Sequence, residues 1–121
     1  MKAQDLKKQL LNVVGPVDFS KTPLDVLQKF ANTETDKNLR KYFFKLQNVA
    51  KTNYPDVDGL IELRETENDI LSNLIQMDFN DETTPFFKRY LTVVCLFPEN
   101  VMNMTLLLNI INYYNISNKK I

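Results

Sequence analysis

The chain offers few side chains for catalysis. Its 121 residues include no histidine, which excludes Ser-His-Asp and Cys-His catalysis, imidazole general bases and most zinc sites. The single cysteine, Cys95, lies in the apolar stretch 92–97 and cannot form an internal disulfide. A nucleophilic thiol needs an electropositive, accessible niche, so we expect Cys95 to be a buried core residue. The residue types therefore predict a non-enzyme with no catalytic residue, metal or cofactor.

Charge is segregated along the chain, although the formal net charge is zero. Residues 1–53 carry ten basic and five acidic side chains, and residues 83–121 carry four basic and one acidic. Residues 54–82 carry nine acidic side chains and one basic one. This central block has a charge of −8, and it is the strongest functional signal in the sequence.

Four of the central acids have helical spacing. They are Asp58, Glu62, Glu65 and Asp69. On a continuous helix, offsets of four, seven and eleven residues nearly complete whole turns, so the four would form a stripe that repels itself unless cations face it. The stripe is either an ordinary solvated helix face or a docking surface for a positively charged protein. The candidate partner-binding residues are Asp56, Asp58, Glu62, Glu65, Asp69, Asp78, Asp81 and Glu82.

Two acidic pairs suggest a metal-dependent alternative. Glu62-x-x-Glu65 resembles the helical carboxylate pairs that bind magnesium in all-α nucleotide pyrophosphatases, and Asp78-x-x-Asp81 follows it like a second half-site. The resemblance implies a magnesium-dependent phosphohydrolase if all four carboxylates converge. The second pair lies where we expect a helix to end, so this alternative ranks last.

Residues 37–51 are basic without a single acid. The basic side chains are Lys37, Arg40, Lys41, Lys45 and Lys51, with Tyr42, Phe43 and Phe44 between them. Basic residues interleaved with aromatic ones are typical of nucleic-acid binding. However, Phe43 falls on the expected core side, and a net charge of zero gives no overall field that attracts phosphates. Nucleic acid is therefore disfavoured, and the face would equally suit an acidic protein or a second copy of the chain.

Glycine and proline mark the expected ends of the first helices. Residues 3–14 have apolar side chains at helical spacing, and Gly15 ends the run. A second helix is predicted to start at Pro23, with Thr22 as its N-cap and Asp25 as the capping-box partner.

Apolar side chains at helical spacing predict a third helix over residues 36–52. Pro55 sets its C-terminal limit, because the residue before a proline rarely adopts the helical conformation. Its expected buried face is Leu39, Phe43, Leu46 and Ala50.

The pattern is ambiguous after the turn signal at Asp58-Gly59. Residues 60–63 are compatible with a short extended segment, and Thr66 with Asp69 forms a capping-box pattern that would start a new helix. A helix continuous from Asp58 would instead place Glu67 on the apolar side, where a charge needs a partner. The sequence therefore favours a break before Thr66.

The C-terminal third contains the two most apolar helices. Thr84 and Pro85 predict the start of one that ends before Pro98, with a strand over residues 90–97 as the alternative. The last helix is expected over residues 99–114, with Thr105, Asn109 and Asn112 as its polar stripe. We expect residues 117–121 to be frayed.

These elements predict an all-α single domain over residues 1–121, a compact bundle of five to six short helices with the last two central. Its predicted core is Leu10, Phe30, Phe43, Leu46, Leu74, Val94, Leu107 and Ile111. No stretch approaches the roughly 18 apolar residues of a membrane span. With no signal-like N-terminus, we expect a soluble cytoplasmic protein without a membrane partner.

The composition favours an interaction protein over an enzyme. The most concrete hypothesis is an inhibitor of the immunity type, which covers the active cleft of a basic, nuclease-like toxin with its acidic block. In size and charge the chain is similar to small helical immunity proteins. The alternatives are an all-α adaptor or regulatory domain, a nucleic-acid-binding module and the magnesium-dependent phosphohydrolase. A homo-oligomer is compatible with each of them.

Overall fold

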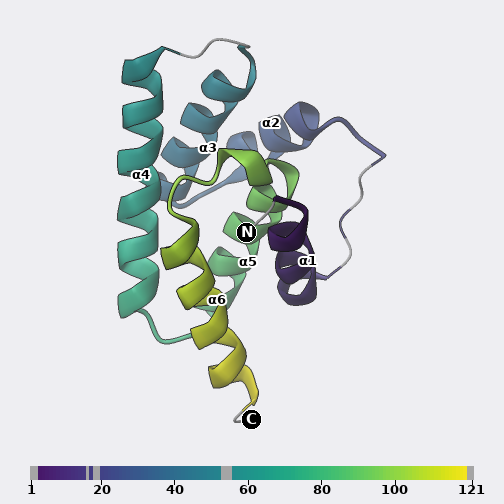
Figure 1. Ribbon diagram of the computed structural model, residues 1–121, viewed down its shortest axis with the longest axis vertical. Coiled ribbons are helices and arrows are strands. Elements are labelled where there is room, and N and C mark those ends of the chain that lie inside the picture. Colours follow the sequence, from purple (N-terminus) through teal and green to yellow (C-terminus); the bar gives the residue numbers. More distant parts are fainter. Residues whose placement is uncertain (1–2, 16, 18–19, 53–55, 120–121) are drawn as a thin grey trace. The chain divides into compact units, whose positions relative to one another are not determined.

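Helices account for all the regular structure in the described part of the chain. The computed structural model describes residues 3–15, 17, 20–52 and 56–119, and these ranges contain six α-helices, one short 3-10 helix and no strand (Figure 1). They are α1 (Ala3–Val14), α2 (Pro23–Thr33), α3 (Lys37–Ala50), α4 (Val57–Gln76), α5 (Thr83–Leu96), η1 (Pro98–Asn100) and α6 (Met104–Lys119). The all-α prediction is confirmed. No helix in these ranges is both long and apolar enough to cross a membrane.

The chain forms two compact units. The first unit contains residues 1–17 and 71–121, and the second unit contains residues 18–70. Helix α4 contributes its residues up to Ile70 to the second unit and those from Leu71 to the first.

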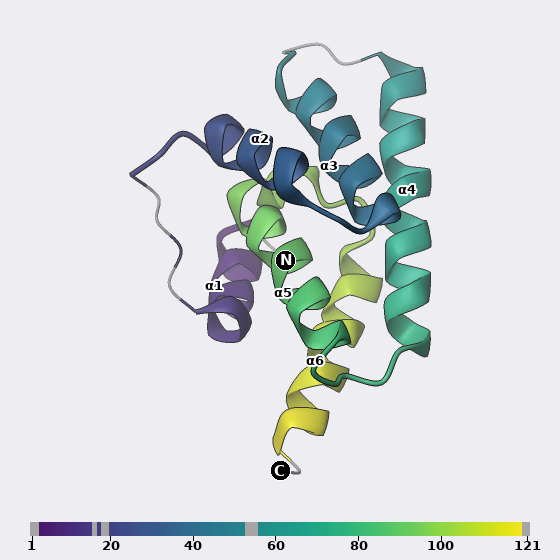
Figure 2. The ribbon, with the colours of Figure 1, turned by 180° about the vertical axis from the view of Figure 1, so that it is seen from behind.

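The second unit is built on the packing of α2 against α3. The ring of Phe30 meets that of Phe43 edge-on, with centroids 6.0 Å apart. Gln47 donates a side-chain hydrogen bond to Gln28. Between the two helices, the buried Glu34 carboxylate accepts hydrogen bonds from the backbone N–H groups of Thr35 and Asp36. In both ribbon views α4 then runs back beside α3 (Figures 1 and 2).

The first unit is organised around α5, which packs on α1 and η1. Half of α5 is buried, including the whole stretch from Val93 to Leu96. Helix α1 ends at Gly15, whose φ of 81° is the left-handed conformation that glycine adopts most readily, as its position predicted. At the other end of α5, the rings of Phe79, Phe87 and Tyr114 form a cluster with centroids 5.0 to 5.3 Å apart.

Helix α4 is continuous, so the predicted break before Thr66 is wrong. The Thr66 hydroxyl does not cap a new helix; it donates to the carbonyl oxygen of Glu62 one turn earlier. Glu67 is fully buried on the inner face of α4, which is where a helix continuous from Asp58 was expected to place it. Tyr42 of α3 is buried as well, and burial together with the nearby Glu67 charge raises the pKa of Tyr42 far above its usual value. The apolar residues on either side of Glu67 are buried, and this keeps the helix intact.

Helix α2 begins at Pro23 after the N-cap residue Thr22, as predicted, but the Thr22 hydroxyl donates to the Asp25 carboxylate and makes no side-chain cap bond. Helix α5 begins before Thr84, because the Asn80 side chain accepts the backbone N–H of Thr83 while the Thr83 hydroxyl accepts that of Asn80. This reciprocal pair is a capping box. The alternative of a strand over residues 90–97 is also wrong, since this segment lies largely in α5.

The last helix is shifted toward the C-terminus. Residues Pro98–Asn100 form η1, and Asn103 accepts the backbone N–H of Leu106 to start α6. Helix α6 continues to Lys119, through part of the segment predicted to fray, and residues 120–121 lie outside the described ranges. The polar stripe of Thr105, Asn109 and Asn112 is exposed as predicted.

Most of the predicted core is confirmed. Leu10, Phe43, Leu46, Leu74, Val94, Leu107 and Ile111 are buried. Phe30 is only half-buried, because Leu27 and Ala31 occupy the inward face of α2. Ala50 is also half-buried, at the last turn of α3.

Candidate functional site

The continuity of α4 brings four predicted partner-binding residues onto one helix face. Asp58, Glu62, Glu65 and Asp69 all lie on α4 within the second unit, and all four are exposed. At about 100° per residue they span a sector of about 60°. We call these four residues the acidic stripe.

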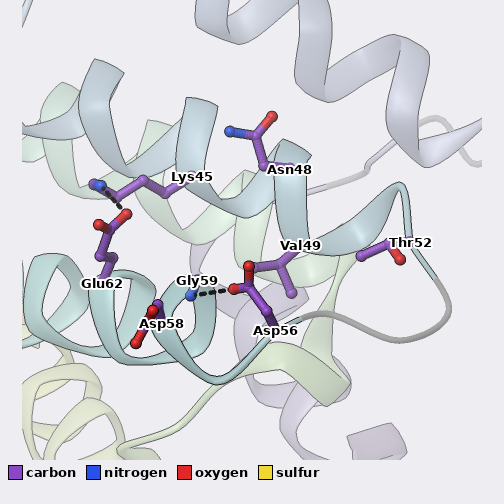
Figure 3. Close-up of a pocket in the computed structure, with 8 residues that line it drawn as sticks. All are labelled: Lys45, Asn48, Val49, Thr52, Asp56, Asp58, Gly59 and Glu62. Atoms are coloured by element: carbon purple, nitrogen blue, oxygen red, sulfur yellow. Dashed lines mark hydrogen bonds and ion pairs between the residues drawn. The ribbon is translucent and has the colours of Figure 1, made fainter.

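The first acids of α4 also have local roles. The Asp56 carboxylate accepts the backbone N–H of Gly59 at 2.6 Å (Figure 3), so it is the N-cap of the helix. A Cβ atom on Gly59 would lie 2.8 Å from that carboxylate oxygen, so a larger residue here would require the Asp56 side chain to shift. Asp58 lies in the first turn, where the helix dipole favours a negative charge. Gly59 is therefore part of α4 and not of a preceding turn.

Helix α3 and its C-cap residue carry a matching row of exposed side chains, four of which are basic. We define the basic stripe as Lys37, Arg40, Lys41, Phe44, Asn48 and Lys51, all exposed. Offsets of three, four, seven, eleven and fourteen residues place them on one side of a helix. At its centre the Arg40 guanidinium lies 5.7 Å from the ring centroid of Phe44, a cation–π geometry.

One ion pair joins the two helices. The Lys45 ammonium lies 2.9 Å from a Glu62 carboxylate oxygen, and the two side chains are 23% and 61% exposed (Figure 3). A pair as open as this stabilises the fold by about 1 kcal/mol or less. The pair also shows which edges of α3 and α4 adjoin.

An open hollow of about 300 Å³ lies beside this pair, between the end of α3 and the start of α4 (Figure 3). It is lined by Lys45, Asn48, Val49, Thr52, Asp56, Asp58, Gly59 and Glu62. Three of these residues are acidic and one is basic. The charged residues that line the hollow are therefore mainly acidic, as in the acidic stripe.

The remaining predicted partner-binding residues belong to the first unit. Asp78, Asp81 and Glu82 are exposed, in the connection that leads into α5. The Asp78 carbonyl oxygen accepts the Thr83 hydroxyl at 2.6 Å, and Asp81 and Glu82 follow the capping residue Asn80. Acids at this position are favoured by the helix dipole, so they have a local reason to be there.

The geometry gives no support to the metal alternative. Among the described residues, no three Cys, Asp or Glu side chains gather closely enough to hold a metal ion. One member of the helical pair, Glu62, already bonds to the Lys45 ammonium.

The aromatic residues of α3 do not form a stacking surface. Tyr42 is 2% exposed and Phe43 is fully buried, so neither can stack on a base. Phe44 is 37% exposed and carries Arg40 over its ring. The interleaving of basic and aromatic residues in the sequence thus reflects one buried face and one exposed face of the same helix.

Cys95 is a core residue, as predicted. Its side chain is fully buried in α5, and this burial raises the pKa of the thiol to about 11, although the positive charge of Lys7 partly lowers it. A raised pKa and a lack of solvent contact are the opposite of what a nucleophile needs.

We expect the native protein to react slowly with a thiol reagent such as 5,5′-dithiobis(2-nitrobenzoate) at mildly alkaline pH. A pKa raised from 9.0 to about 11 reduces the thiolate fraction about a hundredfold, and burial slows the reaction further. The measurement compares the native rate with the rate in denaturant. Equal rates in both conditions would show that Cys95 is accessible and contradict its core role.

The sequence indicates the basic residues of α3 but not their alignment with the acids of α4. The helical spacing of Lys37, Lys41 and Lys51 with Phe44 was a readable signal for a stripe. The pairing of Lys45 with Glu62 had no such signal, because the two residues are 17 positions apart. Comparison of the chain with protein families, with curated proteins and with solved structures finds no match.

Proposed function

We propose that this protein is an interaction protein that binds a basic protein partner through the acidic stripe of α4. The observation that carries the proposal is that Asp58, Glu62, Glu65 and Asp69 form one exposed helix face. Among the described residues, Glu62 is the one member of the stripe that forms an ion pair, with Lys45. A basic partner would relieve the repulsion within the stripe.

The most concrete form of the proposal is an immunity-type inhibitor of a nuclease-like toxin. A nuclease has a basic cleft because it binds phosphates, and an acidic helix face can occupy that cleft in place of the substrate. Opposite charges also steer the two proteins together and speed their association. The protein itself then needs no catalytic residue, which agrees with its lack of histidine.

The test is affinity capture from the native cell extract with matched variants. Glu65→Lys with Asp69→Lys reverses two exposed acids and leaves both the Lys45–Glu62 pair and the Asp56 cap intact. We expect this variant to bind the partner at least tenfold more weakly than the native chain, mainly through a slower association rate. Raising the salt concentration should slow association of the native pair in the same way, because salt screens exposed charges.

The matched control is Lys37→Glu with Lys41→Glu, which reverses two exposed residues of α3. It should retain the partner with nearly native affinity. A partner that binds the acid-reversed variant as tightly as the native chain, or that is lost only with the control, would overturn the proposal. If the captured partner is a nuclease, its activity should fall on addition of the native chain.

A further inference from the structure

The acidic and basic stripes lie on the same side of the α3–α4 pair. Lys45 is at the edge of the basic stripe that faces α4, and Glu62 is at the edge of the acidic stripe that faces α3. Their contact at 2.9 Å therefore places the two stripes next to each other, with the shared hollow between them (Figure 3). The result is one surface with a positive half and a negative half.

The charges of the two halves also follow in the same order along the helices. Because α4 runs opposite to α3, the residues before Lys45 on α3 and those after Glu62 on α4 lie in the same direction from the Lys45–Glu62 contact, and each residue advances about 1.5 Å along its own helix. Lys41 lies about 6 Å from Lys45 and Glu65 about 4.5 Å from Glu62 in this direction, because they are four and three residues away. Lys37 and Asp69 lie further in the same direction, at about 12 and 10.5 Å. In the other direction, Lys51 lies about 9 Å and Asp58 about 6 Å away.

We propose that this surface pairs with the same surface of a second copy in a two-fold symmetric dimer. A two-fold axis parallel to the helices and between them places α3 of one copy over α4 of the other and keeps every residue at its height. Lys37 then faces Asp69 of the other copy, Lys41 faces Glu65, and Lys51 faces Asp58. An axis perpendicular to the helices would instead place α3 over α3, where like charges repel each other. Each contact in such a dimer is made twice.

An exposed apolar side chain also lies within the basic stripe. Phe44 is 37% exposed, and it is one residue from Lys45, so it lies near the midpoint of the stripe along the helix. In the proposed dimer Phe44 would face α4 of the other copy and lose contact with water, which stabilises association.

Charge complementarity favours a second copy over other occupants. A nucleic acid on the basic stripe would meet the acidic stripe beside it, and a basic protein on the acidic stripe would not use the basic stripe. A second copy satisfies both halves at once. The dimer does not depend on the proposed function, but a basic partner would compete with the second copy for the acidic stripe.

The experiment is sedimentation equilibrium of the purified full chain at low and high salt. We expect a dimer at low salt that dissociates toward about 1 M salt, where the screening length falls to about 3 Å. Glu65→Lys with Asp69→Lys makes the surface positive, and Lys37→Glu with Lys41→Glu makes it negative. Each variant alone should dimerise about a hundredfold more weakly, because four opposite-charge contacts become like-charge ones.

The decisive measurement is an equal mixture of the two variants. In a mixed dimer each reversed stripe faces an oppositely charged stripe, so the mixture should recover the native dimer while neither variant does so alone. Circular dichroism checks that both variants are folded. A native chain that stays monomeric at low salt, variants that dimerise like the native chain, or a mixture that stays monomeric would each overturn the dimer. None of these results involves the basic partner, so the proposed function is tested separately.

Discussion

Replacing Glu65 by proline is expected to lower the free energy of unfolding by about 3 kcal/mol or more. Glu65 is exposed in the middle of α4, so the loss comes from the backbone: proline removes a helix hydrogen bond and clashes with the preceding turn. Had the helix started at Thr66, as the sequence favoured, a proline at position 65 would lie before the cap and be tolerated. Urea unfolding followed by circular dichroism measures the difference.

Two controls separate backbone from charge. Glu65→Gln removes the charge and keeps the backbone, and it should change the free energy of unfolding by only about 0.5 kcal/mol. Val57→Pro places proline at the first residue of α4, where its fixed φ is suitable, and should be nearly neutral. A Glu65→Pro protein as stable as these two would contradict the continuity of α4 and, with it, the acidic stripe.

Replacing Phe87 by alanine is expected to cost about 3–5 kcal/mol. Phe87 is fully buried, and its ring centroid lies 5.0 Å from that of Phe79 and 5.3 Å from that of Tyr114. The substitution removes apolar burial and leaves a cavity in the first unit, since neighbouring rings relax only partly. Thermal or denaturant unfolding gives the magnitude.

Tyr113 provides the matched aromatic control. Its ring also contacts Phe79, with centroids 5.7 Å apart, but the side chain is 45% exposed. Tyr113→Ala should therefore cost about 1 kcal/mol or less. Equal losses for Phe87→Ala and Tyr113→Ala would mean that the cluster is not the buried core that its geometry indicates.

Local signals in the sequence determined most helices of this protein. Gly15 ends α1 and Pro23 starts α2, because their backbone preferences act at the residue itself. Asp36 caps α3 by accepting the backbone N–H of Leu39, an interaction within one turn. Periodicity also identified the buried faces, apart from rim positions such as Phe30 and Ala50.

Only the tertiary structure decided what becomes of the residues at which local signals conflict. Thr66 has a capping pattern and Glu67 has a charge, so the local evidence favoured a break. The chain instead keeps α4 intact and buries Glu67 near Tyr42, because the apolar residues on both sides of Glu67 gain more from burial in one continuous face. Likewise, the spacing of the acids was readable in the sequence. Their alignment with the basic stripe was not, because the Lys45–Glu62 contact depends on how α3 and α4 pack, and no short-range rule reaches across 17 residues.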